Sequence, residues 1–128
     1  ITAMRQRMRA ELDRSRADAF DLKHGFGGLT DIEFFLQALV LGHAATNPAL
    51  AACRDSSALV AASAQVGLLT ADEAEFLREG IEVLQAESLR CHLSMRPRVV
   101  APASALQAVR DAVGTILRDH GYDFAPKQ

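Results

Sequence analysis

The fold is decided by residues 21–41, DLKHGFGGLTDIEFFLQALVL, in which a glycine-rich turn runs straight into the most apolar helix of the sequence. Thr30 and Glu33 have the T-x-x-E spacing of a capping box, in which the hydroxyl and the carboxylate each accept a hydrogen bond from a backbone amide. This spacing predicts that the helix starts at Thr30. After Glu33 the side chains are apolar up to Leu41, with Gln37 the only polar interruption. Such a helix is typical of the middle of a helical bundle.

The composition indicates one helical domain. Of 128 residues, 49% are hydrophobic but only 5% are aromatic, and strand-like alternation is nearly absent, which favours helices over sheets. The chain is long enough to bury one core, so we expect a single domain over residues 1–128. Because the sequence starts at Ile1, inside a helical pattern, we also expect it to be a piece of a longer protein.

The charge and the apolar runs argue against several classes of protein. A net charge of −2 gives no overall attraction to nucleic acid. No run reaches the ~18 to 20 apolar residues of a membrane span, and no signal peptide opens the sequence, so we expect a soluble, cytoplasmic protein. Cys53 and Cys91 lack the spacing of a metal site or a redox motif, and we expect buried, reduced thiols.

The apolar periodicity predicts an all-α bundle of about five helices. Thr70 and Glu73 form a second T-x-x-E pair, which opens a long fourth helix of about 24 residues. Asp55 or Ser56 caps the third helix, and Gly67 ends it. The expected helices cover residues 1–18, 31–45, 56–66, 71–94 and 104–119. Residues 20–29 and 99–103 are expected to be connections, and residues 123–128 a frayed tail.

The first helix is expected to turn an apolar stripe toward the core. The stripe consists of Ile1, Met4, Met8, Leu12 and Ala19. The arginines of this region spread over the other faces and are interleaved with acidic residues. They can form a solvated face with ion pairs at helical spacing. Alternatively, some of them face a nucleotide or an acidic partner, because guanidinium groups suit phosphate and carboxylate.

The pair Asp31 and Glu33 has the D-x-E pattern of a metal site, but on a helix two such side chains point about 200° apart and cannot chelate one ion together. Acids in the first helical turn offset the macrodipole, and Glu33 closes the expected cap. Gly25, Gly27 and Gly28 precede a helix N-terminus, where two carboxylates would repel a phosphate. A tight turn packed closely against another backbone fits these glycines better.

The remaining polar residues do not form a complete active site. The four histidines have no metal-ligand spacing, and no Ser lies in a G-x-S-x-G motif. We therefore expect no catalytic residue and no metal ligand in this chain.

Residues 22–34, LKHGFGGLTDIEF, closely resemble the L-K-x-x-x-G-G-x-x-D-I-E-F signature of the glutamine synthetase adenylyltransferases. Residues 4–8, MRQRM, and the order of the later helices resemble that family too. Its members are two-headed enzymes, and each head is a nucleotidyltransferase domain followed by a helical domain. Asp31 resembles the residue found in the C-terminal, adenylylating head. The resemblance implies that this chain is the helical domain of that head.

The resemblance also implies that the parent enzyme transfers AMP from ATP to a tyrosine of glutamine synthetase, with Mg²⁺ held by strand carboxylates of the catalytic domain. Those carboxylates are missing here, so the chain alone is expected to be inactive and to bind no cofactor. The implied partners are the upstream nucleotidyltransferase domain and glutamine synthetase. The expected docking surface consists of Lys23, Gly27, Gly28, Asp31 and Glu33, with Lys23 and Arg5 leaning toward the phosphates of ATP.

A second interpretation is a non-catalytic helical module that recognises a PII-type signal protein or glutamine synthetase itself. A contiguous exposed apolar patch away from the glycine turn would favour it. A third is an unrelated helical bundle whose match to the signature is accidental.

Overall fold

The computed structural model describes residues 2–16, 19–101 and 104–124. Over these ranges the chain forms five α-helices, one 3-10 turn and two strands of two residues each. The elements are α1 (Thr2–Leu12), β1 (Phe20–Asp21), α2 (Leu29–His43), η1 (Pro48–Leu50), α3 (Ser56–Gln65), α4 (Ala71–Leu93), β2 (Val99–Val100) and α5 (Ser104–Asp119). The predicted all-α bundle with a long fourth helix is confirmed. None of the helices in the described part is long and apolar enough to cross a membrane.

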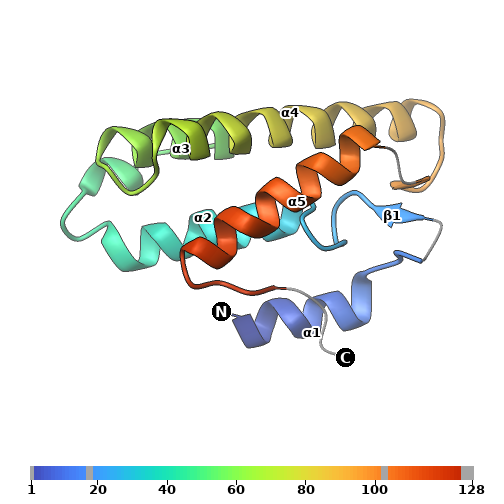
Figure 1. Ribbon diagram of the computed structural model, residues 1–128, viewed down its shortest axis with the longest axis horizontal. Coiled ribbons are helices and arrows are strands. Elements are labelled where there is room, and N and C mark those ends of the chain that lie inside the picture. The colour runs from blue at the N-terminus through green and yellow to red at the C-terminus, as the bar shows by residue number, and fades with distance from the viewer. Residues whose placement is uncertain (1, 17–18, 102–103, 125–128) are drawn as a thin grey trace.

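The core lies between α2, α3, α4 and α5. In Figure 1, α3 and α4 form one layer, α2 and α5 lie against it, and α1 lies at the far side of α2 and α5. Gly80 on α4 lets α5 approach, because a Cβ atom there would lie 3.3 Å from the Cγ1 of Val109. The fully buried apolar side chains of the four helices include Phe35, Leu36, Val60, Leu77, Ile81, Leu84, Val113 and Leu117.

The ends of the later helices follow the sequence signals. Asp55 caps α3 by accepting a hydrogen bond from the Ala58 amide at 2.7 Å. The capping box of α4 is present in both directions, with the Glu73 amide donating to Thr70 Oγ1 and the Thr70 amide donating to the Glu73 carboxylate. These caps and the bounds of α5 confirm the predictions for residues 55–119 outside the short strands.

The predicted start of α2 is wrong. Its N-cap is Gly28, the helix begins at Leu29, and no side chain caps it. Thr30 is buried inside the first turn, its hydroxyl has no hydrogen-bond partner within the described part of the chain, and Glu33 is exposed. The Asp31 carboxylate instead accepts a hydrogen bond from the Gly27 amide at 2.7 Å. Asp31 therefore accepts the backbone amide at the helix start, a role that the T-x-x-E spacing predicted for Glu33.

Two segments expected to be connections pair with each other. Phe20 lies opposite Val100 and Asp21 opposite Val99, in an antiparallel register. The Leu22 amide then donates to the Arg98 carbonyl oxygen at 2.9 Å. Strands of two residues are too short to show the period-two alternation on which a strand prediction depends.

The expected frayed tail is also wrong for its first part. Phe124 is completely buried, and its ring makes an edge contact with Phe34 at 6.5 Å between centroids. The rest of that predicted tail, residues 125–128, lies outside the described residues. An aromatic residue in a polar terminal segment gives no periodic signal, so the sequence alone did not show that it returns to the core.

Helix α1 is shorter than predicted, and its most buried side chains are arginines instead of the expected apolar stripe. It ends at Leu12, because the Ser15 amide donates to the Asp13 carboxylate and the chain turns toward β1. Of the expected inner stripe, Met4 and Leu12 are 52% and 45% exposed, Met8 is half-buried and Ala19 is buried. Ile1 and residues 17–18 of the predicted helix lie outside the described residues. Arg5 and Arg9 are buried instead, at 0% and 5% exposure. The arginine face of α1 therefore points inward.

Glu73 joins the start of α4 to the end of α5. Its carboxylate lies 2.9 Å from Nε2 of His120, whose ring packs against Phe35. Burial alone raises the pKa of Glu73, but the Thr70 amide and His120 outweigh burial and hold the pKa below its ordinary value. Because the folded pKa is the lower one, the stabilisation is present above the unfolded pKa and disappears as the pH falls below it.

We expect the free energy of unfolding to fall less between pH ~6 and pH ~3 in Glu73→Gln than in the unchanged chain, because this ionisation no longer contributes. The measurement is urea unfolding followed by circular dichroism at each pH. Glu82→Gln, an exposed change on the same helix, serves as the control and keeps the original pH dependence. Parallel curves for the unchanged chain and Glu73→Gln would contradict the prediction.

Two glycines with positive φ allow the cost of backbone strain to be measured apart from the cost of a steric clash. Gly27 has φ +77° and a Cβ there would lie 2.8 Å from the Arg110 Cα atom, whereas Gly67 has φ +83° and open space around it. Gly67→Ala should destabilise the chain by about 1 to 2 kcal/mol, the cost of the left-handed conformation. Gly27→Ala should cost about 1 to 3 kcal/mol more, because α5 must shift. Equal losses on thermal unfolding would rule out the close approach of α5.

Candidate functional site

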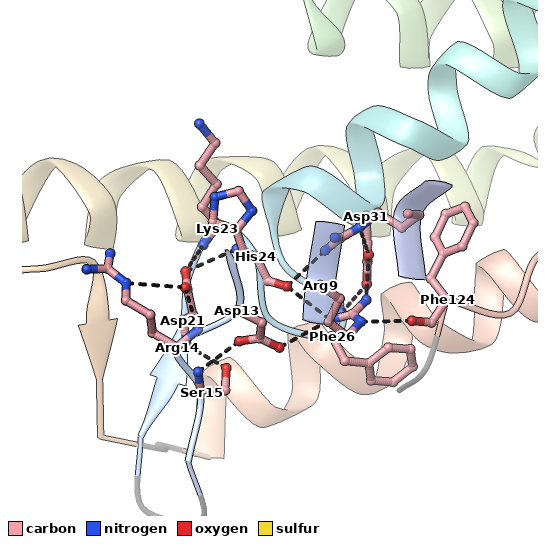
Figure 2. A network of polar contacts seen from close by, with 12 residues as sticks. Arg9, Asp13, Arg14, Ser15, Asp21, Lys23, His24, Phe26, Asp31 and Phe124 are labelled. Carbon is pink, nitrogen blue, oxygen red and sulfur yellow. Dashed lines mark hydrogen bonds and ion pairs between the residues drawn. The ribbon is translucent and has the colours of Figure 1, made fainter. Parts of the chain in front are cut away.

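The candidate site is a buried ionic cluster at the first turn of α2, and Asp31 is its centre (Figure 2). Arg5 donates from Nε to Oδ1 of Asp31 at 2.6 Å. Arg9 donates from Nη2 to both oxygens, at 2.8 and 2.9 Å. Together with the Gly27 amide, these contacts occupy the carboxylate of Asp31, which is completely buried. Two guanidinium groups therefore share one buried carboxylate.

The same two arginines bind backbone carbonyl groups of distant segments. Arg5 Nη2 and Arg9 Nη1 donate to the His24 carbonyl oxygen at 2.9 and 3.0 Å. Arg9 Nε donates to the Phe124 carbonyl oxygen at 3.0 Å. Burial lowers the pKa of Arg5, and the nearby Asp31 carboxylate partly opposes that shift. The cluster thus ties α1 to the glycine turn, to α2 and to the segment after α5.

The glycine turn packs against the backbone of α5, as the sequence predicts. Gly27 lies against the backbone of Arg110, and a Cβ atom at Gly28 would lie 2.7 Å from the Leu22 carbonyl oxygen. Arg110 donates from Nε to the Phe26 carbonyl oxygen at 3.0 Å, and its guanidinium lies 4.1 Å from the centroid of the Phe20 ring. Burial lowers the pKa of Arg110. The turn therefore holds the start of α2 closely against α5.

A second buried carboxylate, Asp21, organises the chain beside the turn. It accepts hydrogen bonds from the backbone amides of Arg14, Lys23 and His24 at 3.0 to 3.1 Å. Its own amide donates to the Ser15 hydroxyl. Burial lowers the pKa of His24, although the Asp21 charge opposes this shift. Asp21 therefore shapes the loop that carries Lys23.

The six residues expected at the docking surface separate into two groups. Arg5, Gly27, Gly28 and Asp31 come together in the interior. Lys23 is half-buried, and Figure 2 shows its side chain extending away from the arginine cluster. Glu33 is exposed and lines a groove of about 510 Å³ together with Met4 and Phe34.

Four residues of the site were missed by sequence reasoning, namely Arg9, Asp21, Arg110 and Phe124. Arg9 follows Arg5 by one helical turn, so the i,i+4 spacing could have placed both on one face. For Arg110 and Phe124 the sequence carries no such signal, because their partners lie 84 and 115 residues away.

The arrangement offers no place for a divalent cation at this turn. Asp31 is committed to two arginines and an amide, while Glu33 faces outward. Over residues 2–16, 19–101 and 104–124, no three His, Cys, Asp or Glu side chains gather closely enough to hold a metal ion. Cys91 is buried and Cys53 half-buried, both as free thiols.

Asp31→Asn should destabilise the chain by about 3 to 5 kcal/mol, because it leaves two buried arginines without their counter-charge. Glu33→Gln, only two residues away but exposed, should change the free energy of unfolding by no more than about 0.5 kcal/mol. Chemical denaturation of the three proteins checks this difference. Similar losses in both variants would mean that the cluster does not depend on the Asp31 charge.

Comparison with known proteins gives the family. A family model described as GlnD PII-uridylyltransferase matches residues 2–99. The bifunctional glutamine synthetase adenylyltransferase/adenylyl-removing enzyme of Xanthomonas axonopodis pv. citri is 44% identical over 124 residues, which are 97% of this chain and 13% of that protein. The enzyme of the same name from Pasteurella multocida is 30% identical over 126 residues, covering 91% of this chain and 12% of that protein.

The chain spans about an eighth of the length of the curated relatives it matches. The similarity nevertheless covers nearly the whole chain and includes the signature of residues 22–34, so the resemblance to glutamine synthetase adenylyltransferases is confirmed. The chain belongs to the family described by the GlnD PII-uridylyltransferase model, and its similar relatives are glutamine synthetase adenylyltransferases.

Proposed function

We propose that this chain is the helical accessory domain of an enzyme that transfers AMP from ATP to a tyrosine of glutamine synthetase. In that enzyme it packs on the nucleotidyltransferase domain and supports it, in the C-terminal head that Asp31 suggests. ATP and Mg²⁺ act at the catalytic domain, in the cytoplasm, and this chain alone is inactive. The names of the relatives and the small share of their length that the chain spans support this proposal.

The observation that carries the proposal is that α1 buries two arginines and leaves part of its apolar stripe exposed. A surface helix normally buries its apolar stripe and exposes its charges. Here Arg5 and Arg9 are buried, whereas the neighbouring Met4 and Leu12 are about half exposed. A helix whose two arginines are neutralised inside is held in place without its apolar stripe. That stripe remains available to a second domain, and exposed apolar surface of this kind marks interaction sites.

The predicted docking residues take different roles in this proposal. Arg5, Gly27, Gly28 and Asp31 do not contact the catalytic domain themselves; they fix the position of α1 and of the loop before α2. Lys23 and Glu33, which point away from the cluster, are the members of the set that reach the partner. Lys23 carries the charge suited to the phosphates of ATP.

The alternative, a module that recognises glutamine synthetase or a PII-type protein, also has one observation in its favour. Leu89, Leu93 and Met95 are 56%, 73% and 94% exposed near the end of α4. Leu89 and Leu93 are one helical turn apart and share a face. This patch includes no residue of the glycine turn. Acidic substitutions there would weaken capture of the partner protein and leave interdomain packing intact.

The two proposals can be distinguished in the full-length enzyme by measuring AMP transfer to glutamine synthetase. The variants Met4→Glu and Leu12→Glu should lower transfer at least about tenfold, because a charge in an apolar contact is costly. Phe76→Glu is the matched control, since Phe76 is 53% exposed and Met4 52%, and it should keep full activity. Lys23→Glu should lower transfer as well, through a higher KM for ATP.

Limited proteolysis of the same variants reports domain packing, and faster cleavage between the two domains is expected only for the α1 variants. Unchanged transfer and unchanged cleavage in Met4→Glu and Leu12→Glu would overturn the docking role of α1. Loss of activity only on substitution of Leu89 and Leu93 would favour the recognition module.

A further inference from the structure

A basic pocket at the end of α4 is not used by any role assigned above. It encloses about 540 Å³ and is lined by Arg14, Ser88, His92, Arg96, Pro97 and Arg98. These residues come from three segments, namely the turn after α1, the last turns of α4 and the link to β2. Three guanidinium groups and an imidazole line the pocket, and no carboxylate is among the lining residues in the described part of the chain.

The arginines of this pocket are largely uncommitted. Arg96 and Arg98 are exposed, and within the described ranges their side chains make no hydrogen bond or ion pair. Arg14 is 57% exposed and lies 3.8 Å from Asp21, whose oxygens already accept three backbone amides. Glu87, at the adjoining surface, pairs with Arg90 at 3.2 Å. Positive charge is therefore left in excess around the pocket.

The backbone that carries these arginines is held on both sides. At the end of α4 the Arg96 amide donates to the Cys91 carbonyl oxygen at 2.8 Å, and Met95 adopts φ +53°, a left-handed conformation that residues other than glycine seldom take. Beyond Pro97, the Arg98 carbonyl oxygen accepts the Leu22 amide at the start of the strand pair. Because the backbone is already fixed, a ligand has to order only the side chains, and less conformational entropy is lost on binding.

Ser88 adds a polar group that the fold leaves unexplained. Its Oγ atom is buried and has no hydrogen-bond partner among the described residues, although Ser88 belongs to the lining. A buried hydroxyl without a partner is uncommon in folded proteins, and a ligand or an ordered water often completes such a group. The pocket thus offers a neutral donor beside several cationic ones.

We propose that this pocket binds the phosphate chain of a small ligand, such as a triphosphate, through Arg14, Arg96 and Arg98. Guanidinium groups bind phosphate oxygens in pairs of parallel hydrogen bonds, and three of them around one cavity suit an anion with several charges. The inference stands on the residues of the pocket and goes beyond the proposed function, because it does not need α1 to dock.

The test is calorimetric titration of the chain with sodium triphosphate, and separately with ATP, without divalent metal and at ~150 mM salt, where weak surface attraction is screened. Saturable binding at one site is expected. The double variant Arg96→Ala, Arg98→Ala should weaken it at least about tenfold. The control Arg54→Ala, Arg78→Ala removes two exposed arginines elsewhere and should bind as the unchanged chain does.

Amide chemical shifts locate the site, and those of Arg14, Ser88 and Arg98 should move on addition of triphosphate. Equal affinity for triphosphate and ATP would show that the phosphate chain alone is recognised; tighter binding of ATP would add a contact to the nucleoside. Three results overturn the proposal: no saturable binding, equal weakening in both double variants, or tighter binding of a Glu-rich peptide than of triphosphate. None of them bears on the docking of α1, which the full-length enzyme tests.

Discussion

The contact on which the structure depends most is the pair of hydrogen-bonded ion pairs from Arg5 and Arg9 to the buried Asp31 carboxylate. Burying three charges is expensive, and such clusters add little net stability when compared with a well-packed apolar core. Such clusters instead fix the relative position of the segments that they join, because a carboxylate accepts guanidinium groups in few geometries. Asp31 thereby sets the rotation of α1 about its own axis. The orientation of the exposed apolar stripe follows from this one side chain.

The glycine turn and the Asp21 loop connect the Asp31 cluster to the rest of the bundle. Gly27 lets the turn lie against α5, and its amide completes the shell of Asp31. Asp21 accepts hydrogen bonds from three backbone amides and so holds Arg14 close to Lys23 and His24. One short segment therefore connects α1, α5 and the strand pair.

Much of the fold could be predicted from the sequence, since helix signals are local. The capping box of Thr70 and Glu73 and the cap at Asp55 act within four residues, and both were found where expected. The same reasoning was wrong at Thr30, because two acids and a threonine in one turn leave several ways to close a helix start. Only tertiary contacts select among them. Arg5 and Arg9 pull Asp31 inward and leave Glu33 outside.

The site was harder to predict than the helices, because its partners are far apart in the sequence. The signature of residues 22–34 identified three residues of the cluster or its turn, namely Gly27, Gly28 and Asp31, but a signature does not show which side chains are buried. Phe124 belongs to the site only through a contact with Arg9 that spans 115 residues. Amphipathic periodicity did not show that Arg5 and Arg9 occupy the buried face of α1. A stripe of apolar residues indicates a buried face only if the neighbouring surface belongs to the same domain.

The bond from Arg9 to the Phe124 carbonyl oxygen also has a consequence for the order of folding. A ribosome releases the amino-terminal helix long before residue 124 leaves the exit tunnel, so α1 waits for its last partner while α2 to α5 assemble. Contacts of such wide separation form late, because the chain must close a long loop first. Until residue 124 is available, the Arg9 guanidinium lacks the carbonyl group that its Nε binds in the folded chain, and this arginine is held through Asp31 and the His24 carbonyl oxygen.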